Sequence, residues 1–175
     1  MFRKLLKKGQ AGFTIIEVMI VLAIAGLIMV VVLVAVPQLQ RSQRNSATTA
    51  VLDRTFTELQ NYATNNNGNY PSGTTNQDGF CERYLSKTAN CSDDSTAAFV
   101  NDPRTGTSMD VQFLDDVDTD PEDFPSSGEP RTITVYVTTG GAKCEGETVT
   151  DGNGARQIAA VVPLEGGAYA CRDNQ

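Results

Sequence analysis

The apolar residues of this chain form one long uncharged run near the start, followed by a more polar remainder. No charged residue occurs between Val18 and Gln40. The densest apolar part, Val18–Val36, would span about 28 Å as a helix, which is close to the thickness of the hydrocarbon core of a bilayer. The pattern therefore predicts a membrane-spanning helix.

Beyond Pro37 the pattern becomes amphipathic. Apolar side chains recur at steps of four, three and four residues, at Leu52, Phe56, Leu59 and Ala63. This stripe predicts a continuous helix from about Thr14 to Thr64, whose second half lays one face on a globular domain. Pro37 removes a backbone donor and should kink or loosen that helix.

An Asn- and Gly-rich stretch, Asn65–Asn69, is expected to end the helix, because Asn-Gly favours positive φ. The chain from Ser72 to Pro130 is predicted to be rich in loops. Period-two and short apolar runs predict strands at Asp110–Leu114, Thr132–Thr138, Gln157–Val162 and Gly167–Cys171. The predicted fold class is α+β, with one long N-terminal helix packed on a small antiparallel β-sheet head.

Charge is distributed unevenly along the chain. The formal net charge is −7, yet four basic residues precede the apolar run, namely Arg3, Lys4, Lys7 and Lys8. Basic residues beside a span keep that end in the cytoplasm, so the head is expected outside it. The acidic remainder is poorly suited to nucleic-acid phosphates, and we expect no nucleic-acid binding by this subunit alone.

The four cysteines all follow the span, where the predicted orientation favours disulfides. Their spacings contain no Cys-x-x-Cys, so structural bridges are favoured over metal or redox chemistry. Four cysteines allow three connectivities. The preferred one is sequential, joining Cys81 to Cys91 and Cys144 to Cys171.

A specific motif lies between the basic leader and the apolar run, Gly9-Gln10-Ala11-Gly12-Phe13-Thr14-Ile15-Ile16-Glu17-Val18. It resembles the class III signal of type IV pilins and pseudopilins. The resemblance implies that a prepilin peptidase cuts after Gly12 and methylates the new N-terminus, Phe13, while the apolar helix is retained. A secretory signal peptide fits less well, because its apolar region spans only about 7–15 residues.

Glu17 places a carboxylate one turn inside the apolar helix. On insertion scales such a charge costs about 2.5–3.5 kcal/mol near the bilayer centre. It could reach the headgroups or be protonated. Alternatively, in a packed filament it pairs with the positive amine of Phe13 on a neighbouring subunit, and the resemblance implies this same role.

The resemblance implies a structural subunit that the pilus assembly machinery polymerises through its N-terminal helix, from the cytoplasmic membrane into an extracellular filament. Such filaments serve adhesion, motility or DNA uptake. A type II secretion pseudopilin is the nearest alternative. Other classes are a minor tip subunit acting as an adhesive binding module, and a monomeric anchored envelope protein.

The expected segments are a cleaved leader at 1–12, a transmembrane and filament-core helix at 13–36, an amphipathic helix half at 37–64 and a disulfide-bonded head at 65–175.

Little in the chain indicates catalysis. Histidine is absent, and there is no phosphate-binding loop or Gly-x-Ser-x-Gly elbow, so we expect neither an enzyme nor a cofactor. The acid-rich Asp115–Asp123 offers calcium ligands at Asp116, Asp118 and Asp120, but Pro121 and Ser127 stand where an EF-hand has its glycine and glutamate. A solvated acidic loop is the simpler interpretation, and no metal site is assigned.

Overall fold

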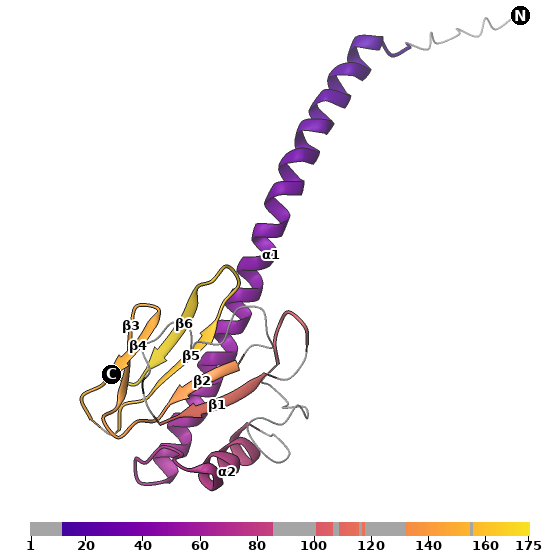
Figure 1. The fold of residues 1–175 in the computed structure, drawn as a ribbon. Coiled ribbons are helices and arrows are strands. Elements are labelled where there is room, and N and C mark those ends of the chain that lie inside the picture. The colour runs from indigo at the N-terminus through magenta and orange to yellow at the C-terminus, as the bar shows by residue number, and fades with distance from the viewer. Residues whose placement is uncertain (1–11, 86–100, 107–108, 116, 118–131, 155) are drawn as a thin grey trace, which may run out of the picture. The chain divides into compact units, whose positions relative to one another are not determined.

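The structure, a computed structural model, describes residues 12–85, 101–106, 109–115, 117, 132–154 and 156–175. The chain divides into two compact units, Met1–Gln40 and Arg41–Gln175. Helix α1, Ile15–Asn65, contributes to both units and contains Pro37. The other elements are α2 (Thr74–Tyr84), β1 (Asp110–Leu114), β2 (Thr132–Tyr136), β3 (Ala142–Glu145), β4 (Thr148–Asp151), β5 (Ala159–Pro163) and β6 (Tyr169–Asp173), as Figure 1 shows.

The strands form a four-stranded sheet in the order β1-β2-β5-β6 and a separate hairpin of β3 and β4. Strand β5 pairs antiparallel with both β2 and β6. Strand β1, however, runs parallel to β2, pairing Val111 with Ile133. The predicted α+β class is confirmed, but the sheet is not wholly antiparallel. A parallel pair needs a crossover of about a dozen residues or more, and the chain between Leu114 and Thr132 is long enough to supply one.

The main core of the second unit lies between α1 and one face of the four-stranded sheet. The predicted stripe is confirmed, since Leu52 and Leu59 are fully buried, and Phe56 and Ala63 are each 7% exposed. The helix packs on apolar side chains of β2 and β5, namely Ile133, Val135, Ala160 and Val162. Burial of this face holds the second half of α1 in place.

The β3–β4 hairpin covers the opposite face of the sheet. Ala159 and Val161 of β5 point to that side and pack with Ala142 and Val149 of the hairpin. All five residues of β5 are buried, which explains its continuous apolar run. The hairpin was not predicted, because each of its strands has only four residues and carries few apolar side chains.

Helix α2 lies in a segment that was predicted to be loop. It has no strong apolar stripe and contains Gly79, so its periodicity gave little indication of a helix. Its anchor is Phe80, which is fully buried and makes ring contacts with Tyr62 of α1 and Phe113 of β1 at 5.8 and 5.9 Å. Tertiary aromatic packing therefore stabilises this helix.

The C-terminal end of α1 has the predicted backbone chemistry. Asn67 has φ of 58° and Gly68 φ of 82°, both in the left-handed region. The Gly68 N–H donates to the Ala63 carbonyl at 2.7 Å, which satisfies one of the free carbonyls at the helix end. The prediction that Asn65–Asn69 ends the helix is confirmed.

Candidate functional site

The N-terminus of α1 is closed by reciprocal hydrogen bonds between Thr14 and Glu17. Glu17 Oε2 accepts from the Thr14 N–H at 2.9 Å and from the Thr14 hydroxyl at 2.7 Å. The Glu17 N–H donates back to Thr14 Oγ1 at 3.3 Å. This is a capping box, and it satisfies donors that the first turn of a helix otherwise leaves free. The Thr-x-x-Glu spacing was the sequence signal for it, and our sequence analysis missed it.

The two carboxylate oxygens of Glu17 are used differently. Oε2 accepts both hydrogen bonds from Thr14, whereas Oε1 accepts none within the part of the chain that the structure describes. Phe13 lies just before the helix and is 88% exposed. The capping box therefore holds a carboxylate at the helix start with one oxygen left to receive a cation.

The apolar part of α1 is uncovered along its length. Each large apolar side chain from Phe13 to Leu39 is between 42% and 88% exposed. The helix is long and apolar enough to cross a membrane. An apolar surface of this extent requires lipid or other protein copies to cover it.

The expected cleavage position is sterically open in the structure. Gly12 and Phe13 precede the helix and are exposed, and a Cβ placed on Gly12 would meet no atom within 4 Å. A peptidase can approach such a backbone closely. Cleavage after Gly12 and methylation of Phe13 stay predictions.

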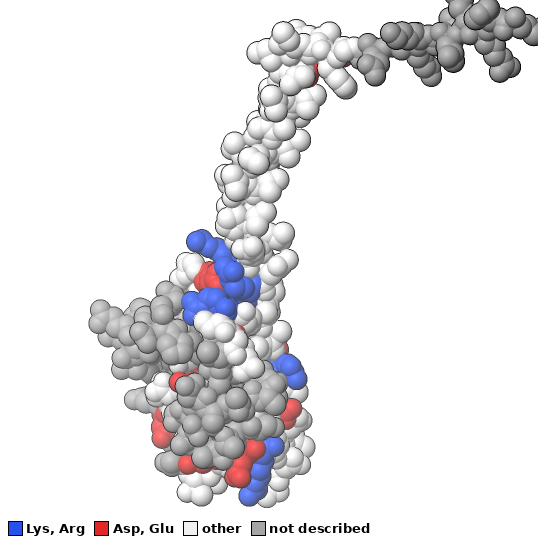
Figure 2. All heavy atoms as spheres, turned by 90° about the vertical axis from the view of Figure 1, so that its right-hand side faces the viewer, with Lys and Arg blue, Asp and Glu red and all other residues white. Residues whose placement is uncertain are grey.

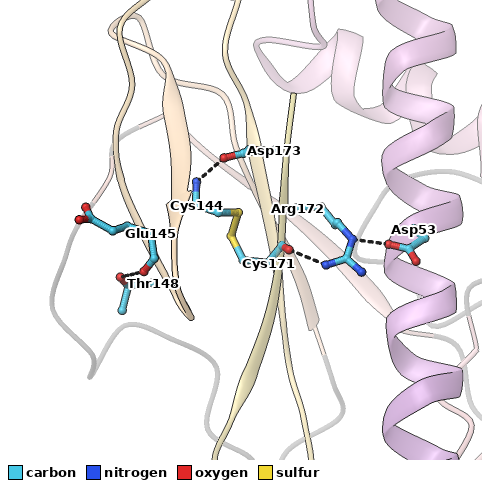
Figure 3. Close-up of a disulfide and its surroundings, with 7 residues drawn as sticks. All are labelled: Asp53, Cys144, Glu145, Thr148, Cys171, Arg172 and Asp173. Atoms are coloured by element: carbon cyan, nitrogen blue, oxygen red, sulfur yellow. Dashed lines mark hydrogen bonds and ion pairs between the residues drawn. A yellow bond between two sulfur atoms is a disulfide. The ribbon is translucent and has the colours of Figure 1, made fainter. Parts of the chain in front are cut away.

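A disulfide joins the β3–β4 hairpin to the main sheet (Figure 3). It links Cys144 of β3 to Cys171 of β6 with 5.9 Å between their Cα atoms, and is one of the two bridges expected from the sequence. Beside it, the Cys144 N–H donates to Asp173 Oδ2 at 2.7 Å. On the helix side of β6, Arg172 Nε pairs with Asp53 Oδ1 of α1 at 2.6 Å. The edge of β6 is thus connected to both neighbouring layers.

Cys81 is also disulfide-bonded, and its side chain is fully buried in α2. Cys91 lies outside the described residues, so the pairing of Cys81 with Cys91 stays a prediction. Burial of Cys81 beside Phe80 places its sulfur in the main core.

The calcium candidates Asp116, Asp118 and Asp120 also lie outside the described residues. Among the residues that are described, no group of three or more Asp, Glu, His or Cys side chains could hold a metal ion. The interpretation of the acid-rich run as a solvated loop without a metal therefore stays a prediction.

A second polar site, which the sequence analysis missed, ties the β5–β6 turn to α1. Glu165 accepts from Arg44 Nε at 2.7 Å and from Arg44 Nη2 at 3.0 Å. Asn45 Nδ2 donates to the Glu165 carbonyl at 3.1 Å, and Asn45 Oδ1 accepts from the Glu165 N–H at 2.8 Å. The hydrogen bonds to Glu165 raise the pKa of the Arg44 guanidinium above its ordinary value. We call Arg44, Asn45 and Glu165 the turn clamp.

An open pocket of about 410 Å³ adjoins the turn clamp and is lined by Arg41, Arg44, Arg104, Glu165 and Gly166. We call it the arginine pocket. Arg104 Nη2 pairs with Asp102 Oδ2 at 3.3 Å, and Asp102 itself is only 2% exposed. Arg104 Nε is buried without a hydrogen-bond partner among the described residues. Figure 2 shows basic side chains gathered around acidic ones at the upper end of the globular unit.

Comparison with known families identifies the N-terminal signal. Residues 7–33 match the family model of the prokaryotic N-terminal methylation motif. A comparison with curated proteins and another with solved structures each found no significant match. The chain therefore carries a signal of the type IV pilin and pseudopilin class, and such a signal implies processing by a prepilin peptidase and pilus-type assembly. With its exposed apolar helix, this signal indicates anchoring in a membrane.

Proposed function

We propose that the chain is the precursor of a type IV pilin, a non-enzymatic subunit that polymerises into an extracellular filament. Cleavage after Gly12 removes the leader, residues 1–12, and Phe13 becomes the methylated N-terminus. The retained helix, residues 13–36, anchors the subunit in the cytoplasmic membrane with its head outside the cytoplasm. In the filament, the same helices from many copies form the core.

The observation that carries this proposal is the uncovered apolar surface of Val18–Val36, placed directly after a methylation motif. A membrane covers this surface before assembly, and neighbouring copies cover it afterwards. One surface therefore supports both an anchored and a polymerised state, since its apolar side chains are stabilised by burial in either.

Glu17 supplies the polar contact within this otherwise apolar assembly. Cleavage creates a positive amine on Phe13, and Glu17 Oε1 has no partner among the described residues. An amine from a neighbouring subunit can bind that oxygen while Oε2 keeps its bonds to Thr14. This pairing fixes the register between adjacent helices, because an unpaired charge in an apolar core costs several kcal/mol.

The head, residues 65–175, remains on the filament surface together with the amphipathic helix half, residues 37–64. Removing the four leader lysine and arginine residues leaves 10 basic residues against 21 acidic ones, a formal charge of −11 on the mature subunit. A disulfide between Cys144 and Cys171 suits a head exposed outside the cytoplasm.

Electron microscopy of sheared filaments, with the chain identified by mass spectrometry as their main component, tests this function. Pilus-like filaments composed mainly of this chain are expected. Type II secretion pseudopilins are the second candidate class. A pseudopilin predicts that no long filaments form on the cell surface and that protein secretion is lost when the chain is deleted. The disulfide-bonded C-terminal region favours a pilin over a pseudopilin, because pilins often have a C-terminal region bounded by cysteines.

Low abundance in filaments that consist mainly of another subunit would assign the chain as a tip subunit with an adhesive head. An anchored protein that never polymerises, and that is not cleaved after Gly12, would exclude the whole pilin class. The abundance of the chain and its N-terminus together separate these outcomes.

A further inference from the structure

The arginine pocket lies where the uncharged run of the chain ends. Arg41 is the first charged residue after Val18–Gln40, and it lies five positions after Val36, the end of the densest apolar part. Five helical residues correspond to about 7.5 Å along the axis, a distance that reaches from the hydrocarbon boundary into the headgroup layer. Arg41 therefore belongs at the depth of lipid phosphates when the apolar helix spans a bilayer.

The charges of the pocket are not balanced by its own acids. Arg44 is paired with Glu165 and Arg104 with Asp102, but Arg41 makes no ion pair within the part of the chain that the structure describes. One positive charge thus remains in excess among these five residues. An arginine of this kind is suited to bind a phosphate, because its guanidinium offers a planar fork of N–H donors.

Two more arginines that line the pocket have a donor left over. Arg44 uses Nε and Nη2 for Glu165, and Arg104 uses Nη2 for Asp102, so Nη1 of each has no partner among the described residues. The pocket is open, and Gly166 contributes no side chain that would fill it. Arg41 and Arg44 stand three residues apart, so they share one face of α1.

We infer that the arginine pocket binds the phosphate of a membrane lipid headgroup while the subunit is anchored in the bilayer. This inference rests on the proposed anchored state. The phosphate contacts Arg41 directly, and the free donors of Arg44 and Arg104 complete its binding. The turn clamp holds Arg44 and the β5–β6 turn in place, so the pocket is formed before the lipid arrives. Extraction of the subunit into a filament then requires release of this lipid.

The test uses the full chain with isotope-labelled arginine, reconstituted in vesicles of phosphatidylcholine and phosphatidylglycerol. Solid-state NMR measures how strongly lipid phosphorus dephases the guanidinium carbons. Arg41→Gln should remove part of the dephased signal. Arg83→Gln is the matched control, because Arg83 is an exposed helical arginine outside the pocket, in the last turn of α2. Both variants lack one arginine, so the difference in dephasing between them reports the contribution of Arg41.

Alkaline carbonate washing separates failure of the pocket from failure of the anchored state. A chain retained in the vesicles, with equal dephasing in Arg41→Gln and Arg83→Gln, would overturn the lipid assignment alone. A chain released by the wash would contradict the anchored state and the lipid assignment together. Retention, with loss of signal only in Arg41→Gln, is the expected result.

Two further samples test other occupants of the pocket. In an uncharged detergent with inorganic phosphate, wild type and Arg41→Gln should show equal dephasing, and an Arg41-dependent contact there would assign the pocket to a free anion instead. In vesicles that mix copies carrying labelled arginine with copies carrying labelled carboxylates, no Arg41-dependent contact between copies is expected. Such a contact would assign the pocket to a second subunit.

Discussion

The side-chain amide of Asn45 hydrogen-bonds both backbone groups of Glu165, although the two residues are 120 positions apart in the chain. The Asn45 amide acts like a short piece of a neighbouring strand, donating to the carbonyl and accepting from the N–H. Arg44, the preceding residue, binds the Glu165 carboxylate through two nitrogens. Every hydrogen-bonding group of Glu165 is thus held by one turn of α1, and the β5–β6 turn is fixed on the helix.

Replacing Asn45 with alanine should destabilise the head. The substitution removes two hydrogen bonds and leaves the backbone groups of Glu165 without them, which predicts a loss of about 1–3 kcal/mol. Asn61→Ala is the control, because Asn61 is exposed on the same helix and its side chain bonds, among the described residues, only to Glu58. Denaturant unfolding in detergent micelles, followed by near-UV circular dichroism, measures both. Equal midpoints for the two variants would show that the turn clamp contributes nothing to stability.

Loss of the Cys144–Cys171 bridge should release the β3–β4 hairpin from β6. The bridge closes a loop with a sequence separation of 27 residues, so the chain-entropy model predicts a loss of about 3–4 kcal/mol for Cys144→Ser with Cys171→Ser. Arg172→Gln breaks the neighbouring ion pair with Asp53 and should cost about 1 kcal/mol or less, because both side chains are largely exposed. Limited proteolysis should cut the hairpin only in the cysteine variant. A hairpin that stays protected without its disulfide would refute this role.

Gly141→Ala should be strongly destabilising. Gly141 has φ of 86°, and a Cβ built on it would clash with the Gly154 carbonyl oxygen. The strained backbone alone costs about 1–3 kcal/mol, and the clash adds to it. Gly140→Ala is the matched control, because a Cβ there meets nothing within 4 Å. Thermal unfolding of the two variants should differ by several degrees, and similar melting temperatures would contradict the observed packing of the two turns.

Glu17→Gln separates the two roles of Glu17. Glutamine can replace glutamate in a capping box, so the start of α1 and membrane insertion should survive. The charge that binds the Phe13 amine of a neighbouring subunit is lost, and removing one member of a desolvated ion pair typically costs about 3–5 kcal/mol. We expect normal cleaved subunit in membranes and a large drop in sheared filament. Thr14→Val is the complementary control, because it removes the capping hydroxyl and keeps the charge. Wild-type filament yield from cleaved Glu17→Gln would show that this ion pair does not drive assembly.

The sequence predicted the parts of the fold that depend on local pattern. The stripe through Leu52 and Leu59 reports which face of the helix is buried, and a single chain segment is enough to show this. The alternation around Ile133 predicted a strand, although both faces of β2 are buried after Thr132. Helix α2 and the β3–β4 hairpin were missed because contacts from other segments stabilise them. Phe80 is held by Tyr62 and Phe113, and the hairpin by the disulfide to β6.

The candidate sites divide in the same way. The methylation motif is contiguous, and residues 7–33 could be recognised without a structure. The capping box was also local, but the sequence-based interpretation of Glu17 considered its charge and its pairing with a neighbouring subunit, and not its bonds to Thr14. The turn clamp and the arginine pocket join α1 to residues that are distant in the sequence, and no local pattern marks Glu165 as the partner of Arg44, 121 positions away. Such pairs follow from the packing of the helix on the sheet.

The intact mass of the membrane-anchored form tests the central claim most directly. The account predicts a single species that begins at Phe13, carries one added methyl group on its N-terminus and lacks residues 1–12. Fragmentation of the N-terminal peptide should place that methyl group on the Phe13 nitrogen. A species that retains Met1, or one that begins beyond Pro37 and has lost the apolar helix, would contradict the assignment of this chain as a type IV pilin precursor.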